Sequence, residues 1–595
     1  TASASLRASR PAHSRRRAMS SSASRLMREE RDVQNQTVPT IFAQPEETDI
    51  HHWRAMIVGP PGTPYCLGLF HFDMRFPQDY PNSAPKVHIT TTSGGSVRFN
   101  PNLYATGKVC LSILGTWRAE NSGEMWSAVQ SVSSVLMSIQ SLLHDAPYHN
   151  EPSFEKDDGS GDPQRYNHKI LHETLRVGVC EVMEETLEAR TISANGVCPA
   201  FAHTRRQLFN MYHERYLSEC ERLSDEASAK DGAAFKMMPF ECSSNGMSGT
   251  FGWAKIKARL LKLHESLRAE IETWRRQGAE QTRLLRASHD ASVNSCVRWL
   301  LQEEEPTAES QPRPHSRCRC VHYLLQQEER IKREIPEGAS IGADPANACV
   351  WTATLFGPPD SPWDGGMFTV EMVFPPDFPD APPAVRFTTP LFHPQINGQG
   401  VPYLRCLVMW TYAEPKERTI ATVMRQLVGL FAHDPSPEPA THINPAAATL
   451  HFSRSEEERK ESKRRARKCA CRGTRTTSPL TLLGTVQARQ AMRAALDGHV
   501  TPTPLRDLSS SPLPPRRLPL LPALLSLSPA ASPPRPPPAA PRRQPAPRSP
   551  QQHRHRVKSV SRRTVGARGG LRDRAERRAR AEVVGVPGRA RASRL

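Results

Sequence analysis

Parts of this 595-residue chain occur twice, 298 residues apart, and this internal repeat limits the possible folds more than any other feature. The turn-forming stretch GPPGTPY at Gly59 returns as GPPDSPW at Gly357. After each stretch, apolar residues recur at every second position: Phe70, Phe72, Met74 and Phe76 in the first copy, and Phe368, Val370, Met372 and Phe374 in the second. This period of two predicts a strand with one buried face, and the Pro-rich segments around it predict turns.

A helix with one apolar face is predicted after the strand in both copies. Its apolar residues have the same internal spacing in each copy: Val132, Val135, Leu136, Ile139, Leu142 and Leu143 in the first, and Ile420, Val423, Met424, Leu427, Leu430 and Phe431 in the second. Such a stripe is typical of a helix that packs against a sheet. Two copies of one α+β domain are the economical interpretation.

The basic charge of the chain belongs to its C-terminal tail. The formal net charge is +19, but residues 501–595 alone hold 21 Lys and Arg against four Asp and Glu, so the rest is nearly neutral. This tail contains no aromatic residue for base stacking. We therefore expect at most weak electrostatic binding of nucleic acid through the tail, and a protein whose main function is nucleic-acid binding is disfavoured.

Cysteine usage and hydropathy indicate the compartment. The thirteen cysteines are an odd number without the regular spacing of a disulfide framework, and Thr1 is not followed by a secretory signal. The longest apolar runs are far shorter than the ~20 residues of a membrane span. We expect a cytoplasmic and/or nuclear protein that does not bind a membrane.

Six parts of the chain are predicted. Apolar residues at helical intervals in 166–188 and 253–274 indicate helices between the two copies, packed on a neighbouring domain or, alternatively, forming a binding platform. Low apolar content indicates disorder at both ends. The predicted parts are a disordered N-terminus (1–24), a first domain (25–165), a helical extension (166–300), a linker (301–316), a second domain (317–471) and a disordered Pro- and Arg-rich tail (472–595).

The stretch FNPNLYATGKVCLSILGTW, from Phe99 to Trp117, carries the chemistry. It places Asn102 in an Asn-Pro-Asn turn eight residues before Cys110. Cysteine is a nucleophile that is partly ionised near neutral pH. An amide donates a hydrogen bond to a developing oxyanion. This combination suits acyl transfer through a thioester, although a cysteine in an apolar context is by itself more often a buried small hydrophobe.

This stretch resembles the active-site segment of ubiquitin-conjugating enzymes (E2s), whose signature is His-Pro-Asn with a cysteine eight residues later. Asn100 stands where most E2s have His. The first copy looks most like the large E2s with a C-terminal extension. The resemblance implies two UBC-like α+β domains, each with an antiparallel sheet of about four strands and flanking helices. It also implies Cys110 as the ubiquitin carrier and Asn102 as the oxyanion donor.

The resemblance further implies the partners: ubiquitin or a ubiquitin-like protein, an E1 activating enzyme and an E3 ligase. ATP would be used by the E1, and we expect no cofactor and no metal. The helix predicted from Arg25 would face the E1, although a plain surface helix is an equal alternative. Ligases would meet the segments Pro81-Asn82-Ser83 and Trp126-Ser127-Ala128, which lack the usual Phe and Pro of these loops.

Other residues are weaker candidates. By position, Asn150 and Glu151 are candidates to orient an incoming lysine, although an ordinary polar loop is the preferred interpretation of these residues. In the second copy, His393 and Gln395 resemble the motif, and Cys406 follows eleven residues after Gln395. Cys406 is a possible second nucleophile, with Gln395 or Asn397 as its amide donor. Cys318, Cys320, Cys469 and Cys471 lack the usual zinc spacing.

Three alternatives to an active E2 stay open. The chain could be a catalytically inactive scaffold in which both domains bind ubiquitin or a ligase. It could be an E2 for another ubiquitin-like modifier, which nothing in the sequence decides. The third is the nucleic-acid-binding protein that the missing aromatic residues disfavour.

Overall fold

A computed structural model describes residues 21–35, 40–117, 124–192, 201–242, 246–302 and 319–473. The first repeat forms a four-stranded antiparallel sheet in the order β1-β2-β3-β4. Its strands are β1 (Ile41–Glu46), β2 (Asp49–Val58), β3 (Leu69–Arg75) and β4 (Lys86–Ile89). Phe70, Phe72 and Met74 of β3 are buried in one core, as the alternation predicts.

The second repeat forms an equivalent sheet in the order β5-β6-β7-β8. Its strands are β5 (Ala339–Asp344), β6 (Asn347–Phe356), β7 (Met367–Val373) and β8 (Ala384–Phe387). The alternating residues Phe368, Val370 and Met372 of β7 are fully buried in a separate core. The prediction of two α+β domains, each with a sheet of four antiparallel strands, is confirmed.

The predicted apolar helices are α2 (Val132–Ser141) and α9 (Ile420–Ala432), and both begin at equivalent caps. Ser131 accepts a hydrogen bond from the backbone N–H of Ser134, and Thr419 accepts one from Thr422. Such caps satisfy backbone donors that have no partner within the helix. In both helices the apolar stripe packs into the core of its own domain.

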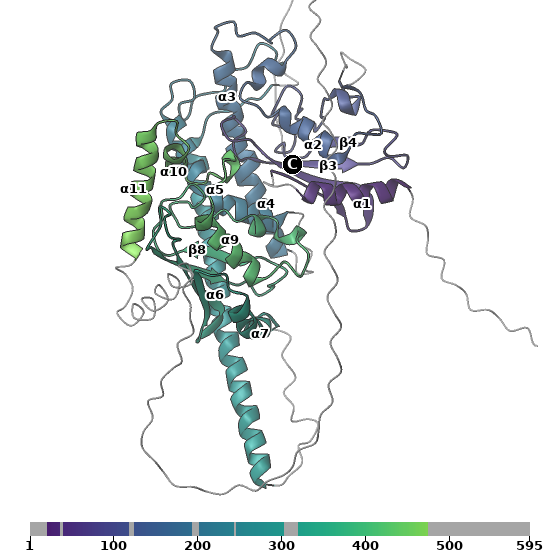
Figure 1. The fold of residues 1–595 in the computed structure, drawn as a ribbon. Helices are drawn as coiled ribbons and strands as arrows, with labels where there is room; N and C mark the ends of the chain where they lie inside the picture. The colour runs from purple at the N-terminus through teal and green to yellow at the C-terminus, as the bar shows by residue number, and fades with distance from the viewer. Residues whose placement is uncertain are drawn as a thin grey trace, which may run out of the picture. The chain divides into compact units, whose positions relative to one another are not determined.

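Helices α1 (Ser21–Gln34) and α7 (Arg319–Glu334) precede the two sheets (Figure 1). α1 begins four residues before the predicted domain boundary at 25. Short helical turns complete the domains: η1 (Ser112–Leu114), η3 (Pro147–Asn150), α8 (Arg405–Val408), η6 (Trp410–Tyr412), η7 (Pro439–Thr441) and α10 (Pro445–His451).

The predicted helical extension is present and contains more helix than the sequence indicated. It comprises α3 (Asp162–Glu173), the π-helical segment η4 (Thr174–Glu181), α4 (Val182–Ile192), α5 (Ala202–Ser224) and α6 (Trp253–Gln302). The prediction for 253–274 covered only the first part of α6, which is 50 residues long. α5 was not predicted. Its residues Leu208, Phe209, Met211, Tyr212 and Tyr216 are all buried.

A third core joins the extension to both domains. It contains Phe42, Met56 and Leu69 from the first sheet, apolar residues of α5 and α6, and Tyr403 and Val408 from the second domain. α5 also forms hydrogen bonds with both domains. Tyr216 Oη donates to Leu67 O of the first domain at 2.9 Å, and Tyr212 Oη donates to Ala440 O of the second domain at 2.8 Å. The extension therefore packs on neighbouring domains, as one of its two interpretations predicted.

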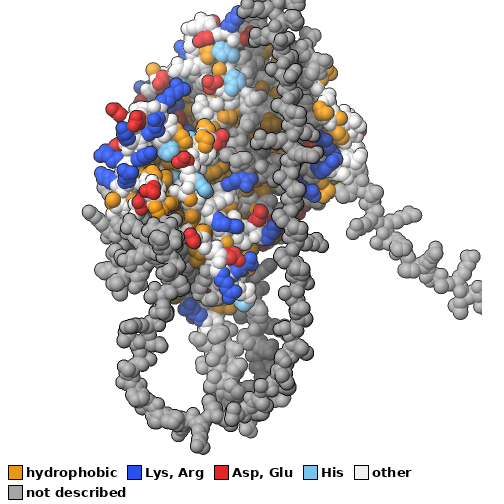
Figure 2. Space-filling model, in the orientation of Figure 1, with side chains coloured by type: hydrophobic (Ala, Val, Ile, Leu, Met, Phe, Trp, Pro, Cys, Tyr) orange, Lys and Arg blue, Asp and Glu red, His pale blue; other side chains and the backbone are white. Residues whose placement is uncertain are grey.

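The second domain ends in α11 (Glu456–Gly473), the strongly charged helix that follows its last turns. Figure 2 shows Lys and Arg side chains gathered over this helix, and Lys460, Arg464 and Arg465 are at least half exposed there. Among the described residues, no helix combines the length and the apolar character needed to cross a membrane. The predictions for residues 1–20, 303–316 and 474–595 lie outside the described residues.

Candidate functional site

Cys110 and Asn102 lie side by side in the first domain, on the loop between β4 and η1. The backbone N–H of Cys110 donates to Asn102 O at 2.9 Å, and Asn102 Nδ2 donates to Cys110 O at 3.0 Å. These two bonds hold the cysteine and the amide in one fixed register. Among the described residues, the second N–H of the buried Asn102 amide makes no hydrogen bond.

The Cys110 side chain is covered. The residue is only 1% exposed, and its neighbours Val109, Ile113 and Leu114 belong to the core of the first domain. A protein-sized thioester cannot reach a thiol in this state. Use of Cys110 as a nucleophile therefore requires local opening around it.

Asn100, which stands at the usual histidine position, is completely buried and fully hydrogen-bonded. Its Nδ2 donates to Tyr65 Oη at 2.8 Å and to Leu142 O at 2.9 Å. Its Oδ1 accepts from the backbone N–H of Asn102 at 2.9 Å. The asparagine is thus a well-satisfied structural replacement, not a packing defect.

Asn150, one of the two predicted lysine-orienting residues, contacts Asn100 of the active-site segment, and Glu151 contacts Arg98 directly before this segment. Asn150 Nδ2 lies 3.3 Å from Asn100 Oδ1, and Asn150 Oδ1 accepts from His144 Nε2 at 2.8 Å. Glu151 forms an ion pair with the buried Arg98 at 3.2 Å. Both side chains support the site, and their role toward a substrate lysine stays a prediction.

The second domain repeats the backbone of this site with different residues. The N–H of Tyr403 donates to Gln395 O at 2.8 Å, as the N–H of Cys110 donates to Asn102 O. Isolated β-bridges also occur at equivalent positions of the two loops: Asn100 pairs with Leu103 in the first domain, and His393 pairs with Ile396 in the second. Tyr403, eight residues after Gln395, therefore occupies the cysteine position. Counting this spacing in the sequence would have identified it.

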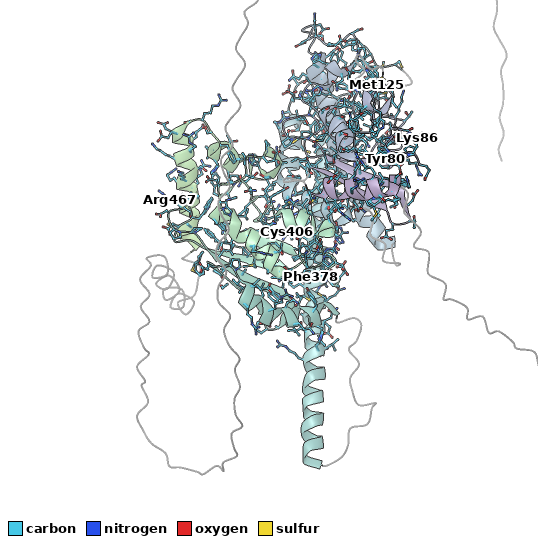
Figure 3. The ribbon with its side chains drawn as sticks, turned by 45° about the vertical axis from the view of Figure 1, so that its right-hand side comes forward. Tyr80, Lys86, Met125, Phe378, Cys406 and Arg467 are labelled. Carbon is cyan, nitrogen blue, oxygen red and sulfur yellow. The ribbon has the colours of Figure 1, made fainter. Side chains whose placement is uncertain are left out.

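Cys406 lies one turn further on, in α8 (labelled in Figure 3). Its backbone N–H donates to Gln426 Oε1 at 3.0 Å, and its side chain packs against the core of the second domain. Burial raises the pKa of the Cys406 thiol to about 12, so the thiolate form is rare at neutral pH. The raised pKa of this thiol and its place three residues beyond the position equivalent to Cys110 both disfavour it as a nucleophile.

The side chains of the two predicted amide residues of the second domain, Asn397 and Gln395, hydrogen-bond to groups other than Cys406. Asn397 Nδ2 donates to the carbonyls of Asn210 and Met211 in α5, at 3.2 and 3.3 Å. Gln395 Oε1 accepts from the backbone N–H of Ser436 at 3.3 Å. The structure thus does not bring Gln395 or Asn397 to Cys406 through any hydrogen bond among the described residues.

The two loops expected to meet ligases form one surface on the first domain. Trp126 Nε1 donates to Pro81 O at 2.8 Å, and the ring of Trp126 lies 5.8 Å from that of Tyr80. Met125, beside the tryptophan, is 56% exposed, and Figure 3 labels it on the same side of the domain as Tyr80. The predicted loops are therefore neighbours in space.

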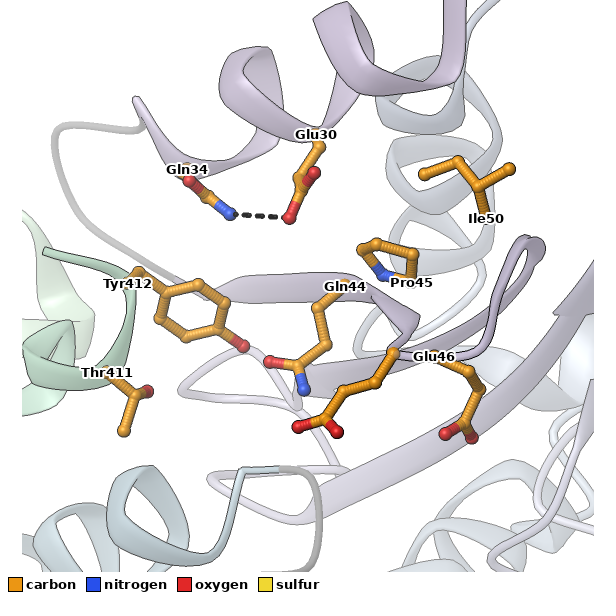
Figure 4. A pocket seen from close by; sticks show the side chains of 9 residues that line it. Glu30, Gln34, Gln44, Pro45, Glu46, Ile50, Thr411 and Tyr412 are labelled. Carbon is orange, nitrogen blue, oxygen red and sulfur yellow. Dashed lines mark hydrogen bonds between the residues drawn. The ribbon is translucent and has the colours of Figure 1, made fainter. Parts of the chain in front are cut away.

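A cleft of about 530 Å³ lies where the second domain reaches α1 (Figure 4). It is lined by Glu30, Gln34, Gln44, Pro45, Glu46, Glu47, Ile50, Thr411 and Tyr412. Gln34 Nε2 donates to Glu30 Oε1 at 3.5 Å, and burial raises the pKa of the Glu30 carboxyl. This end of α1, the helix predicted to face the E1, therefore lies next to the second domain.

Of the four cysteines near the ends of the second domain, Cys320, Cys469 and Cys471 lie within the described residues. Cys320 is buried, and its thiol donates to Pro375 O at 3.2 Å. Cys318 lies outside the described residues. No group of three or more His, Cys, Asp or Glu side chains in the described ranges is arranged to hold a metal ion.

The fold and the first site define the class of this chain: a tandem protein of two ubiquitin-conjugating domains. The sequence profile of the family described as ubiquitin-conjugating enzyme matches twice, at residues 25–169 and 324–469. The ubiquitin-conjugating enzyme E2 Z of Xenopus tropicalis is 39% identical over 245 residues, which are 41% of this chain and 71% of that protein. This chain belongs to the ubiquitin-conjugating enzyme (E2) family and is an E2-type transferase.

Other relatives match shorter parts. The human ubiquitin-conjugating enzyme E2 Z is 50% identical over 162 residues, which are 27% of this chain and 45% of that protein. The human dual E2 ubiquitin-conjugating enzyme/E3 ubiquitin-protein ligase BIRC6 is 36% identical over 187 residues, 31% of this chain and 4% of that protein. The chain thus spans less than half of the human E2 Z protein.

Proposed function

We propose that the first domain accepts ubiquitin from an E1 as a thioester on Cys110 and transfers it to a substrate lysine or to an E3. The observation that supports this most is the register of Cys110 and Asn102. One backbone hydrogen bond, and one bond from the Asn102 side chain to Cys110 O, hold the amide beside the cysteine, and one N–H of the amide has no partner among the described residues.

The first step is a thioester exchange. The Cys110 thiolate attacks the carbonyl carbon of the ubiquitin–E1 thioester, a new C–S bond forms, and the E1 thiolate leaves. ATP is consumed earlier, by the E1. In this chain the residues around Cys110 must open for the step, because the thiol is covered in the described state.

The second step is aminolysis. A lysine amine attacks the thioester carbon, the C–N bond forms, the Cys110 thiolate leaves and the amine loses a proton. Negative charge develops on the carbonyl oxygen, and the proposed role of Asn102 is to stabilise this charge with its second amide N–H. An E3 cysteine would replace the amine in transfer to a ligase of that type. Asn150 and Glu151 would act on the amine from the neighbouring loop.

We further propose that the second domain carries no thioester. Tyr403 stands at the cysteine position and cannot form one, and the Cys406 thiol is disfavoured by its high pKa and by its register. The second domain then serves as a binding and packing module, which is the scaffold alternative applied to one half of the chain.

The family implies an E1 and an E3 as partners, and we propose ubiquitin as the modifier because the similar proteins are named for ubiquitin. Pro81, Trp126 and the exposed Met125 are the proposed ligase surface. The lack of a disulfide framework in the sequence supports a cytoplasmic and/or nuclear location.

The test is a charging assay with E1, ATP and ubiquitin, resolved on non-reducing gels. We expect a thiol-sensitive adduct with the wild-type chain and with Cys406→Ser, and none with Cys110→Ser. An adduct lost in Cys406→Ser but kept in Cys110→Ser would reverse the assignment. If wild-type protein formed no adduct with ubiquitin, the same assay with ubiquitin-like proteins would separate a different modifier from an inactive scaffold.

A further inference from the structure

Two clefts meet at the turn between β1 and β2, and both are lined by residues 44–47. The α1 cleft, of about 530 Å³, is the one at the end of α1 (Figure 4). The extension cleft, of about 810 Å³, lies between the first sheet and the helices η4, α4 and α5. Because the two clefts share a wall, one extended ligand can contact both of them.

Three stacked rings connect the two clefts. The rings of His71 and Phe201, both in the extension cleft, have centroids 6.1 Å apart and planes 27° apart. Phe201 in turn stacks at 6.4 Å on Tyr412, which lines the α1 cleft. Side chains on one face of an extended peptide repeat about every 6.7 Å. The spacing of the rings therefore matches that of alternate residues in such a peptide.

Two polar groups at the ends of this stack, His71 Nε2 and Tyr412 Oη, are buried and have no hydrogen-bond partner among the described residues. Figure 4 shows the Tyr412 hydroxyl pointing into the α1 cleft. Arg205 Nη2 can only donate, so His71 Nδ1 accepts from it at 3.3 Å and the imidazole proton lies on Nε2. Burial, and after it Arg205, lowers the pKa of His71, and burial raises the pKa of Tyr412. Both groups are therefore neutral donors that lack an acceptor.

The walls of the two clefts also carry carboxylates without a cationic partner. Glu30 lines the α1 cleft, Glu185 lines the extension cleft, and Glu47 lines both. None of the three forms an ion pair among the described residues. Burial raises the pKa of Glu30, and it raises the pKa of Glu185 despite the nearby Arg205. Since a cation stabilises a buried carboxylate, the clefts are complementary to positive charge and disfavour a polyanion.

We propose that the two clefts form one groove that binds an extended peptide with several Lys or Arg side chains, supplied by a partner protein. Backbone carbonyls of the peptide accept from His71 Nε2 and Tyr412 Oη, and its cationic side chains pair with the three carboxylates. The groove needs the first domain, the extension and η6 of the second domain. Neither Cys110 nor Asn102 lines it, so the inference does not rest on their proposed function.

The test is a fluorescence-anisotropy titration of labelled acetyl-Lys-Ala-Lys-Ala-Lys-amide with the full chain, without E1 or ubiquitin. We expect saturable binding to wild type and at least about tenfold weaker binding to Glu30→Gln/Glu185→Gln, because two charge-assisted contacts are lost. The matched control is Glu265→Gln/Glu337→Gln, at two exposed carboxylates that line neither cleft. It should bind like wild type. No saturable binding, or equal weakening in both double variants, would overturn the inference.

The hydroxyl of Tyr412 separates a binding role from a structural one. Tyr412→Phe keeps the ring and removes a buried hydroxyl that has no partner, so the free energy of unfolding should not fall. Peptide affinity should nevertheless decrease about three- to tenfold, the effect of one lost hydrogen bond. Spermine has several ammonium groups but no carbonyl, and it should bind at least about tenfold more weakly than the peptide. Unchanged affinity in Tyr412→Phe, or equally tight binding of spermine, would contradict the assignment of a peptide.

Discussion

Tyr403 of the second domain holds the backbone position that Cys110 holds in the first. Both N–H groups donate to the carbonyl of the residue eight positions earlier, Gln395 O in one domain and Asn102 O in the other. The loop geometry is thus kept while the nucleophile is not. Tyr403 is 5% exposed and packs with α5 in the core that joins the domains. The part of the second domain that corresponds to the Cys110 site therefore packs against the helical extension.

Restoring the cysteine in the second domain should therefore not restore a thioester. We expect Tyr403→Cys combined with Gln395→Asn, in a Cys110→Ser background, to form no ubiquitin adduct. The reason is that Asn397 and Gly398 beside this site are bound to α5, through Asn210 O, Met211 O and Glu214 Oε2. The charging assay on non-reducing gels measures this. A thiol-sensitive adduct on the introduced thiol would show that α5 does not block this site.

Loss of the Asn102 amide should slow aminolysis. Removing one oxyanion donor typically costs on the order of 100–1000-fold in rate, and we expect Asn102→Ala to lower lysine discharge by about this factor. Charging should fall less. Discharge is measured in a pulse-chase assay after the E1 is blocked. The control is Asn35→Ala, a substitution at an exposed residue. Equal discharge rates in Asn102→Ala and wild type would show that this amide does not stabilise the transition state.

Strands and helices with one buried face could be predicted from the sequence, because the burial of one face sets the spacing of the apolar residues. The alternation of β3 and β7 and the stripes of α2 and α9 depend on one buried face each, which a period of 2 or 3.6 residues reveals. α5 lacks such a stripe because it lies between two domains and is buried on several sides. Its contacts join residues about 200 positions apart, as in the hydrogen bond from Thr204 to Val408.

For the site, residue type alone did not identify the position of the second domain that is equivalent to Cys110. Cys406 was selected as the nearest cysteine, whereas the shared geometry of the two loops places Tyr403 at the equivalent point. In the first domain, the Asn102–Cys110 spacing predicted their proximity correctly. The contact between Tyr65 and Asn100 could not be predicted, because it spans 35 positions and depends on the turn that Gly59 begins.

The buried ion pair between Lys169 of α3 and Glu241 should be important for stability. Lys169 Nζ lies 2.7 Å from both carboxylate oxygens, and both side chains are 1% exposed. Removal of one partner leaves an uncompensated buried charge, which costs about 3–5 kcal/mol. We expect Lys169→Met to lower the free energy of unfolding by this amount in urea titrations.

The double variant Lys169→Met/Glu241→Leu should regain much of that loss, because no lone charge stays buried. The exposed pair Lys460–Glu456 provides the matched control, with both side chains 71% exposed. Lys460→Met should change stability by about 0–1 kcal/mol. A similar loss in both single lysine variants would indicate that burial of the first pair has no special effect.

The stacked imidazoles of His213 in α5 and His264 in α6 should make the extension sensitive to acid. Their rings are 4.1 Å apart and nearly parallel. Burial, followed by repulsion from His264, lowers the pKa of His213 to about 4, and burial and Arg268 lower the pKa of His264. In the unfolded chain both pKa values return to about 6.5. Between pH 6.5 and 4 the unfolded state therefore binds more protons than the folded state.

The free energy of unfolding should accordingly decrease as the pH falls from about 6.5 toward 4. Urea unfolding at pH 7.5, 6.0 and 5.0 measures the slope. His213→Phe should flatten it, because the variant keeps an aromatic ring between α5 and α6 and removes the titrating group. His322, exposed on α7, is the control, and His322→Gln should leave the slope unchanged. An equal slope in His213→Phe and wild type would place the acid sensitivity at other buried histidines, such as His393, whose pKa burial lowers to about 3.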